Sequence, residues 1–209
     1  MTAHRKIRVL IADDHAMVRV GLGSLLGTKP DIEIVGEAED GEEAVRRAGE
    51  LLPDVLLMDL MMPRKSGVTA TAEIHATHPE IRILVLTSIG SSDAIVRAIR
   101  AGAAGAIMKS ADFAALVTAV RKVAGGEAVI SPEIRRLIDE DPPVAELTGR
   151  QSAILESVVR GLTNADIAVQ LGIQENTVKS YFASICEKLG AANRAEAVAI
   201  ALRKHLLKI

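Results

Sequence analysis

The stretch PDVLLMDLMMPRKSG, residues 53–67, decides how the surrounding chain folds. Its short apolar run, Val55 to Met58, follows a Pro-Asp break and is typical of a parallel strand buried on both faces. The run stops at Asp59, which we expect at the carboxyl end of that strand. In open α/β sheets this edge holds ligands and reacting groups, so Asp59 is a candidate site residue. The alternative is an Asp that only caps the next helix, because turn-forming acids are common after strands.

Apolar runs of strand length alternate with helical stretches on both sides of this segment. The predicted strands are Ile7–Ala12, Ile32–Ala38, Val55–Met58, Ile83–Leu86 and Gly105–Met108. The predicted helices are Ala16–Leu26, Gly41–Leu51, Gly67–His78, Ser91–Ala101 and Asp112–Ala124. This alternation predicts a doubly wound, five-stranded parallel sheet with helices on both faces, in the flavodoxin-like strand order 2-1-3-4-5.

Length and composition limit the class of protein. The 209 residues are enough for one α/β domain of roughly 120 residues and a smaller second domain. A single cysteine, Cys186, excludes an internal disulfide and fits a reducing compartment. No apolar run approaches the ~20 residues of a membrane span, and the first six residues lack the apolar core of a signal peptide. We therefore expect a soluble, cytoplasmic protein without membrane contact.

Charge differs between the two parts of the chain. Residues 1–146 contain 17 Lys and Arg against 22 Asp and Glu, a balance of −5, whereas residues 147–209 contain 8 against 5, a balance of +3. The acidic and basic parts are therefore predicted to be different modules.

Polar residues follow four of the predicted strands. Asp13 and Asp14 follow the first strand, Asp59 ends the third, Thr87 ends the fourth and Lys109 ends the fifth. Each alone is explained as a turn residue, but together they fall at one sheet edge, where a site is expected. Clustered carboxylates need a cation, and an all-oxygen site suits Mg²⁺. With Mg²⁺ bound, Asp59 is placed to attack a phosphoryl group as a carboxylate nucleophile.

From residue 5 to about residue 125, the chain resembles the receiver domain of bacterial two-component response regulators. The motifs that carry this resemblance are DDH at 13–15, MDLMMP at 58–63, LTS at 86–88 and Lys109. The resemblance implies that a sensor histidine kinase phosphorylates Asp59, that Thr87 and Lys109 contact the phosphoryl group, and that the group is lost by slow self-hydrolysis. It implies a stoichiometric acceptor rather than an enzyme. The implied Mg²⁺ ligands are Asp13, Asp14, Asp59 and the main-chain carbonyl of Met61.

Two departures from the family pattern affect the expected switch. Ala106 stands where the family usually carries Tyr, Phe or His on the fifth strand, so the usual aromatic switch does not operate there. Met61 and Ile89, which flank the acceptor and the hydroxyl in the family pattern, are apolar and do not orient water. We therefore expect a long-lived phosphoryl group and a weakly coupled switch that acts through the loop from Ser88 to Ser92.

The chain is predicted to contain a first domain over 1–126, a linker over 127–146 and a second domain over 147–209. Within the linker, Pro132 begins a short helical stretch to about Ile138, which the following Asp-Pro-Pro breaks. We interpret its acidic run as a solvated surface.

The second domain is predicted to be entirely helical. Its predicted helices are Gly149–Arg160, Asn164–Leu171, Glu175–Leu189 and Asn193–Lys204, and Thr148 caps the first. The second and third surround a turn that contains Gly172, which indicates a helix-turn-helix, a motif that recurs in DNA-binding domains. An ordinary helical hairpin is the alternative.

The third of these helices has two distinct faces. Its apolar residues recur at helical spacing and should pack inward; they are Val178, Phe182, Ile185 and Leu189. The outward residues are Asn176, Lys179, Ser180, Ala183 and Glu187. Lys179, near the amino end, suits a base or phosphate contact, and the hydroxyls of Thr177 and Ser180 suit phosphates or base edges.

This segment resembles the LuxR-type DNA-binding domain, through LT-R, GLTN-DIA, LGI, TVK, I-KLG and NR-EA. The whole chain thus resembles response regulators of the NarL/FixJ type. The resemblance implies binding to double-stranded promoter DNA as a homodimer joined by the last helix, for which core packing is the alternative. The predicted DNA contacts are Asn176, Thr177, Lys179, Ser180, Tyr181 and Lys188. Gly149 and Tyr181 replace the family's usual Pro and His, and neither change removes the fold. Ala183 replaces a base-reading side chain of many relatives, so no target sequence is implied.

The interpretation is therefore a response regulator transcription factor that is phosphorylated on Asp59. A phosphatase of the haloacid dehalogenase type is excluded, because that family needs a second Asp where this chain has Met61. The remaining alternative is a DNA-binding regulator controlled by partner binding without phosphorylation. The complete set of polar residues at the sheet edge argues against that alternative.

Overall fold

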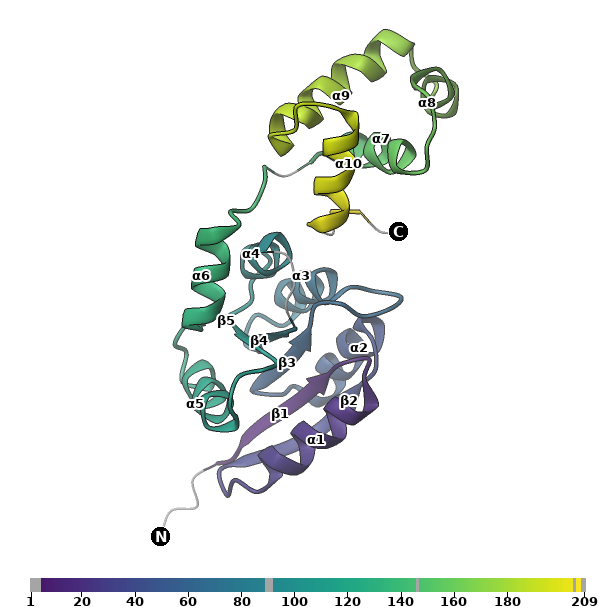
Figure 1. Cartoon of the computed structure of the whole chain (residues 1–209). Helices are drawn as coiled ribbons and strands as arrows, with labels where there is room; N and C mark the ends of the chain where they lie inside the picture. Colours follow the sequence, from purple (N-terminus) through teal and green to yellow (C-terminus); the bar gives the residue numbers. More distant parts are fainter. Residues whose placement is uncertain (1–4, 89–91, 146, 205, 208–209) are drawn as a thin grey trace. The chain divides into compact units, whose positions relative to one another are not determined.

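The computed structural model describes residues 5–88, 92–145, 147–204 and 206–207, which divide into two compact units, Met1–Glu140 and Asp141–Ile209. The first unit is built on a parallel sheet, and the second consists of helices (Figure 1). None of the helices in the described ranges is long and apolar enough to cross a bilayer.

The sheet of the first unit has the strand order β2-β1-β3-β4-β5-β6, and every neighbouring pair is parallel. The strands are β1 (Ile7–Ala12), β2 (Ile32–Ala38), β3 (Val55–Asp59), β4 (Arg82–Thr87), β5 (Gly105–Met108) and β6 (Val129–Ile130). The predicted order of the first five is confirmed. All five residues of β3 are buried, as expected for a central parallel strand.

The sixth strand corrects the prediction of a five-stranded sheet. The N–H groups of Val129 and Ser131 donate to the carbonyls of Ala104 and Ala106, both at 3.1 Å, and so extend the sheet beyond β5. A strand of two residues is too short to show an alternation of apolar and polar positions, so the sequence does not predict β6. It forms because the edge of β5 is free to pair.

In the part of the first unit that the structure describes, six helices cover the two faces of the sheet. They are α1 (Ala16–Gly27), α2 (Gly41–Leu51), α3 (Gly67–Thr77), α4 (Ser92–Arg100), α5 (Phe113–Ala124) and α6 (Pro132–Glu140). Apolar residues of α2, α3, α4 and α6 form one core layer, and those of α1 and α5 form the other. The predicted first residue of the fourth helix, Ser91, lies outside the described residues.

Helix α6 belongs to the first unit, although residues 127–146 were predicted to be a linker. Ile134 is fully buried in the same apolar layer as Ala106 and Ile95, and Leu137 and Ile138 pack against that layer. Leu137 and Ile138 lie three and four positions after Ile134 and therefore share its helix face. The segment that separates the two units is consequently shorter than predicted, because the division falls after Glu140.

The second unit contains four helices around one apolar core. They are α7 (Gly149–Val159), α8 (Asn164–Leu171), α9 (Glu175–Leu189) and α10 (Arg194–Arg203). Thr148 and Thr163 form capping boxes with Gln151 and Asp166, which fix where α7 and α8 begin. Gly172 ends α8 with φ 63°, a left-handed backbone that glycine adopts without steric cost, and this turn sets α9 against α8.

Candidate functional site

The polar residues predicted at the sheet edge do converge in space. Asp13 directly follows β1, Asp59 ends β3, Thr87 ends β4 and Lys109 directly follows β5. The strands are parallel and in register, with Asp59 paired to Leu86 and Thr87 to Met108, so their carboxyl ends form one edge. The Lys109 N–H also donates to the Thr87 carbonyl at 2.7 Å, which fixes where the lysine leaves the sheet.

The Lys109 ammonium lies between two buried carboxylates. Its Nζ is 2.7 Å from Asp13 Oδ2 and 2.9 Å from Asp59 Oδ2. The side chains of Asp13 and Asp59 are only 1% and 5% exposed, and that of Lys109 is 17% exposed. One cation thus faces two anions in a place from which water is largely excluded, and the site carries an excess of negative charge.

Burial and this charge excess shift the protonation equilibria. Burial raises the pKa of Asp59, and the neighbouring Asp13 carboxylate adds to that increase, while Lys109 opposes it. Burial alone would lower the pKa of Lys109, but the carboxylates of Asp13 and Asp59 outweigh it and raise that pKa. Lys109 is therefore charged at neutral pH, and the acid pair is the part of the site that a second cation would stabilise.

The donor set fits a hard divalent cation. Asp13, Asp14, His15 and Asp59 each offer a ligand atom, and these atoms lie within 4.8 Å of one another. Asp13 Oδ2 is buried and accepts no aligned hydrogen bond from the described residues, so its contact with Lys109 is an ion pair only. Carboxylate oxygens at an open edge suit Mg²⁺, which retains water ligands. His15 Nδ1 lies 2.7 Å from Asp14 Oδ1, a contact that sequence reasoning did not predict.

Two main-chain features shape the site around Asp59. The Met61 N–H donates to Asp59 Oδ1 at 3.4 Å, while the Met61 side chain is exposed. A Cβ on Gly67 would lie 1.9 Å from the Asp59 carbonyl oxygen, so only glycine allows α3 to begin so close to the acceptor strand. Thr87 is buried and its hydroxyl donates to the Ser88 carbonyl at 2.9 Å. Ile89, predicted to flank that hydroxyl, lies outside the described residues.

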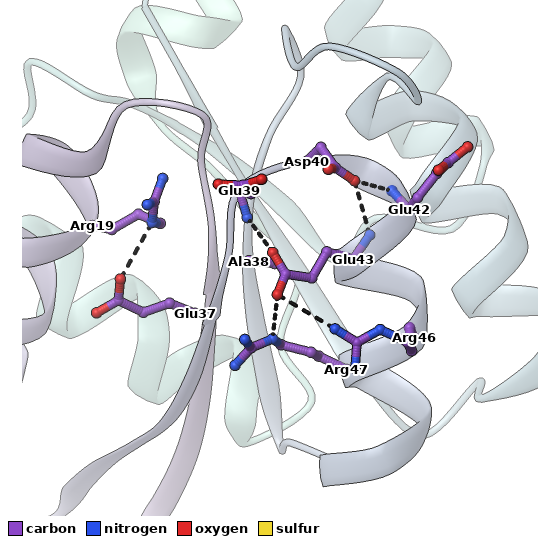
Figure 2. Close-up of a pocket in the computed structure, with 9 residues that line it drawn as sticks. All are labelled: Arg19, Glu37, Ala38, Glu39, Asp40, Glu42, Glu43, Arg46 and Arg47. Carbon is purple, nitrogen blue, oxygen red and sulfur yellow. Dashed lines mark hydrogen bonds and ion pairs between the residues drawn. The ribbon is translucent and has the colours of Figure 1, made fainter.

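A cavity of about 650 Å³ opens elsewhere, beside β2 and α2, and it does not include the residues of the sheet-edge site (Figure 2). Five carboxylates and three arginines line it, and many of these charges pair with one another. Arg19 pairs with Glu37 at 3.2 Å, and Arg47 pairs with Glu43 at 2.7 Å.

The outward face of α9 is confirmed as exposed. Asn176, Lys179, Ser180, Ala183 and Glu187 are all exposed, and Thr177 is exposed as well. Lys179 Nζ lies 2.9 Å from Glu175 Oε1, and both side chains remain about half exposed, at 57% and 49%. These side chains therefore form one solvent-exposed face of α9.

Two further residues predicted to contact DNA are positioned differently. Lys188 is half-buried, and its Nζ donates to Gln151 Oε1 at 2.9 Å. Tyr181 is half-buried and packs against the core of the second unit. The sequence does not reveal that Lys188 turns inward, because its partner Gln151 lies on α7, far away along the chain.

The alanines of α10 divide between two faces. Ala197 and Ala201 are buried in the core of the second unit, whereas Ala195, Ala199 and Leu202 are exposed on the opposite side. Core packing therefore explains Ala197 and Ala201. It does not explain Ala195, Ala199 and Leu202, which are the residues of α10 left for a contact between copies of the chain.

Comparison with known proteins gives consistent matches over both units. Residues 9–121 match the response regulator receiver domain, and residues 145–201 match the luxR family of bacterial regulatory proteins. The response regulator protein VraR of Staphylococcus aureus (strain NCTC 8325 / PS 47) is 39% identical over 207 residues, which are 97% of this chain and 99% of VraR.

Two solved structures extend the comparison. The response regulator ChrA of a heme-sensing two-component system is 34% identical, with a TM-score of 0.58 over 98% of this chain and 100% of ChrA. The response regulator RcsB in complex with DNA is 25% identical, with a TM-score of 0.67 over 95% of this chain and 99% of RcsB.

Proposed function

This chain belongs to the response regulators that join a receiver domain to a LuxR-type DNA-binding domain, and on that premise we propose that Asp59 is its phosphoacceptor. A sensor histidine kinase donates the phosphoryl group, and the second unit binds double-stranded promoter DNA as a homodimer. The chain acts as a stoichiometric acceptor and not as a turnover enzyme.

The observation that carries the proposal is the Lys109 ammonium held between Asp13 and Asp59, at 2.7 and 2.9 Å. An Asp59 carboxylate oxygen forms the new O–P bond while the P–N bond of the kinase's phosphohistidine breaks, and the leaving imidazole nitrogen takes up a proton. Lys109 already lies against that carboxylate, where it neutralises charge on the arriving phosphoryl oxygens. The Thr87 hydroxyl, now directed to the Ser88 carbonyl, turns to donate to one of those oxygens.

Asp13, Asp14, Asp59 and the Met61 carbonyl would hold Mg²⁺ at this site. The buried Asp13 Oδ2, which accepts no aligned hydrogen bond from the described residues, supports this assignment. When bound, Mg²⁺ supplies positive charge for the phosphoryl oxygens.

The proposed DNA contacts are the exposed residues of α9, namely Asn176, Thr177, Lys179 and Ser180. We leave Lys188 out because its ammonium is bound to Gln151, and we assign Tyr181 a mainly structural role because it packs on the core. The exposed side of α10, with Ala195, Ala199 and Leu202, is the proposed contact between the two copies on DNA.

The test is phosphorylation by acetyl phosphate with Mg²⁺, followed by intact-mass analysis. Wild-type protein should gain one phosphoryl group, and Asp59→Asn should gain none while it retains weakened Mg²⁺ binding. A phosphoryl group retained in Asp59→Asn would show that another residue is the acceptor. Wild-type protein that takes up no phosphoryl group, yet binds its DNA, would favour a regulator controlled by partner binding.

A further inference from the structure

Arg64 has a backbone conformation that calls for an explanation. It lies in the loop between β3 and α3 and has φ 61°, in the left-handed region that residues with a Cβ rarely adopt. Leu52, the other non-glycine residue with positive φ in the described ranges, ends helix α2, where this conformation is common. Arg64 ends no helix; the Lys65 N–H donates to the Pro63 carbonyl at 2.7 Å, so Arg64 is the centre of a tight turn, and contacts of its side chain can hold it in place as well.

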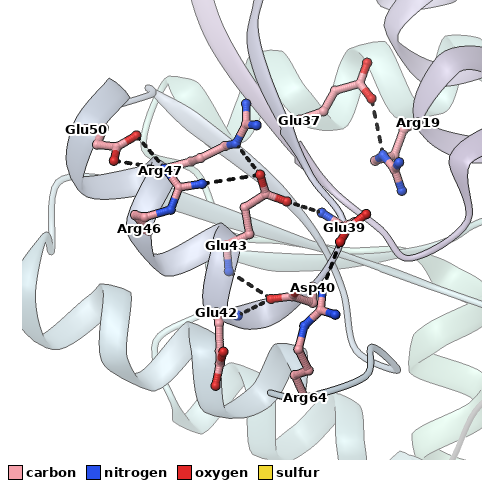
Figure 3. Close-up of polar contacts among 10 residues, drawn as sticks. All are labelled: Arg19, Glu37, Glu39, Asp40, Glu42, Glu43, Arg46, Arg47, Glu50 and Arg64. Atoms are coloured by element: carbon pink, nitrogen blue, oxygen red, sulfur yellow. Dashed lines mark hydrogen bonds and ion pairs between the residues drawn. The ribbon is translucent and has the colours of Figure 1, made fainter.

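The Arg64 side chain provides those contacts. Its Nη2 pairs with Asp40 Oδ2 and lies 3.0 Å from Glu39 Oε1 (Figure 3). The Asp40 side chain is 4% exposed, and its other oxygen, Oδ1, accepts the N–H groups of Glu42 and Glu43 at 2.7 and 2.8 Å. One buried carboxylate therefore caps α2 and binds Arg64 at the same time.

The rest of the loop is fixed at both ends by close backbone packing. A Cβ on Gly41 would lie 2.3 Å from the Lys65 carbonyl oxygen, so the first turn of α2 rests directly on the loop. The Gly67 N–H donates to the Leu60 carbonyl at 3.0 Å. Between these ends, Met61 has one long contact with the acceptor, from its N–H to Asp59 Oδ1 at 3.4 Å. Met62 is buried in the apolar core, and the ion pairs of Arg64 attach the middle of the loop a second time, to the first turn of α2.

We propose that Arg64, bound to Asp40, is a positioning residue that holds the Met61 main chain at the acceptor site and so sets the affinity of the site for its divalent cation. This inference rests on the proposed function, in which the Met61 carbonyl is a metal ligand. The first turn of α2 thereby becomes part of the support of the site, although no residue of α2 belongs to the acidic cluster. Groups that orient metal ligands typically change metal affinity by about 10- to 100-fold when removed.

The experiment measures Mg²⁺ binding to the full chain by titration calorimetry, in four single variants and in the double variant Arg64→Gly with Asp40→Asn. Arg64→Gly removes the guanidinium but keeps a residue that favours the left-handed backbone. Asp40→Asn keeps the helix cap, because Asn caps as well as Asp, but removes the charge that binds Arg64. Arg64→Lys is the conservative variant. Arg46→Ala is the matched control, since Arg46 is similarly exposed, at 57% against 52%, and its ion pairs among the described residues lie within α2, with Glu43 and Glu50.

Arg64→Gly and Asp40→Asn should each raise the Mg²⁺ dissociation constant roughly tenfold, at the lower end of the usual range for such groups. The double variant should be no weaker than either single variant, because both remove the same contact. Arg64→Lys should recover part of the affinity, and Arg46→Ala should match wild type. A dissociation constant within twofold of wild type in Arg64→Gly would overturn the inference, even if its melting temperature fell, because that pattern indicates a purely structural contact.

Failure of this inference and failure of the proposed function give different results. If wild type accepts a phosphoryl group from acetyl phosphate and Arg64→Gly keeps its Mg²⁺ affinity, only the role of Arg64 is lost. If wild type accepts none but Arg64→Gly still weakens Mg²⁺ binding, the positioning role stands and the acceptor role of Asp59 is lost. Wild-type protein that binds no Mg²⁺ would overturn both.

Discussion

Two lysine–carboxylate pairs of equal length serve different purposes in this molecule. Lys109 and Asp59 in the first unit, and Lys179 and Glu175 in the second, each lie 2.9 Å apart. The first pair is 17% and 5% exposed and the second is 57% and 49% exposed. A buried charge must keep a partner, whereas an exposed pair competes with water and contributes little. Lys109 therefore has its partners inside the folded unit, whereas Lys179 remains open to an anion from outside the protein.

The contrast indicates how each unit works under the proposed function. At the sheet edge, a phosphoryl group enters an existing cluster of charges and rearranges it. On α9, a DNA phosphate can replace Glu175 as the partner of Lys179 with little change in the fold. Distance alone does not distinguish the two pairs, so burial decides which one is structural.

The largest expected effect comes from removing the buried lysine. Lys109→Ala leaves Asp13 and Asp59 facing each other without their cation, and we expect a loss of about 3 kcal/mol in the unfolding free energy of the first unit at pH 7. Mg²⁺ should restore part of it. Urea unfolding followed by circular dichroism, with hydrogen exchange to assign the transition, measures the loss.

Lys179→Ala is the matched control for that experiment and should change stability by less than about 0.5 kcal/mol. Equal losses in the two variants would mean that burial does not separate the two pairs.

A smaller effect, in this case a gain in stability, is expected when the negative charge of Asp59 is removed. Asp59→Asn removes one of two anions around Lys109, and we expect a gain of about 1 kcal/mol in stability at pH 7 without Mg²⁺. Because the pKa of Asp59 is raised above its ordinary 3.8, the native wild type binds more protons than the unfolded chain between these two values. Wild-type stability therefore falls as pH rises through this window and stays reduced above it.

The gain from Asp59→Asn should accordingly be complete at neutral pH and shrink as the solution is acidified towards pH 3.8. With Mg²⁺ at ten times its dissociation constant, wild type should recover about 1.4 kcal/mol, and the variant less. Thermal unfolding across a pH series checks both statements. An Asn variant that is less stable than wild type at pH 7 would contradict the charge excess assigned to the site.

The next effect concerns coupling between the two units. A ligand shifts a two-state equilibrium only by its difference in interaction energy with the two states, and an aromatic ring is one large element that could differ. Ala106 is fully buried beside β6 and shares its apolar layer with Ile134 of α6, so it offers almost no such surface. We expect a coupling of about 1 kcal/mol, low in the usual range.

Titration of a bound DNA fragment with unmodified and beryllofluoride-treated protein measures that coupling. A gain in affinity of several hundred-fold would show that Ala106 does not weaken the switch.

The smallest expected effect tests the exposed pair directly. If Lys179 contacts a phosphate, Lys179→Ala should weaken specific and random DNA similarly and reduce the salt slope by about one. Glu175→Gln should strengthen binding to both kinds of DNA, because it removes the carboxylate that competes with DNA for Lys179. A loss confined to specific DNA would indicate base reading, and no change in either variant would place Lys179 outside the interface.

The sequence alone predicted the parts of the structure that depend on local pattern. Buried parallel strands produce continuous apolar runs, and the residue that ends each run falls at a known edge of the sheet, so the sequence predicts that Asp13, Asp59, Thr87 and Lys109 share one edge. In the same way, helical spacing predicted that Val178 and Ile185 face inward and that Lys179 faces outward.

Features that depend on contacts between distant segments required the tertiary structure. β6 exists because β5 offers a free edge, and Lys188 turns inward because Gln151 of α7 lies within reach. Arg64, whose backbone is left-handed, pairs with Asp40, which lies 24 residues earlier in the chain. Periodicity records which face of an element is buried, but it contains no information on which polar group of another element will lie opposite. That choice is made only when the packed elements bring their side chains within hydrogen-bonding distance.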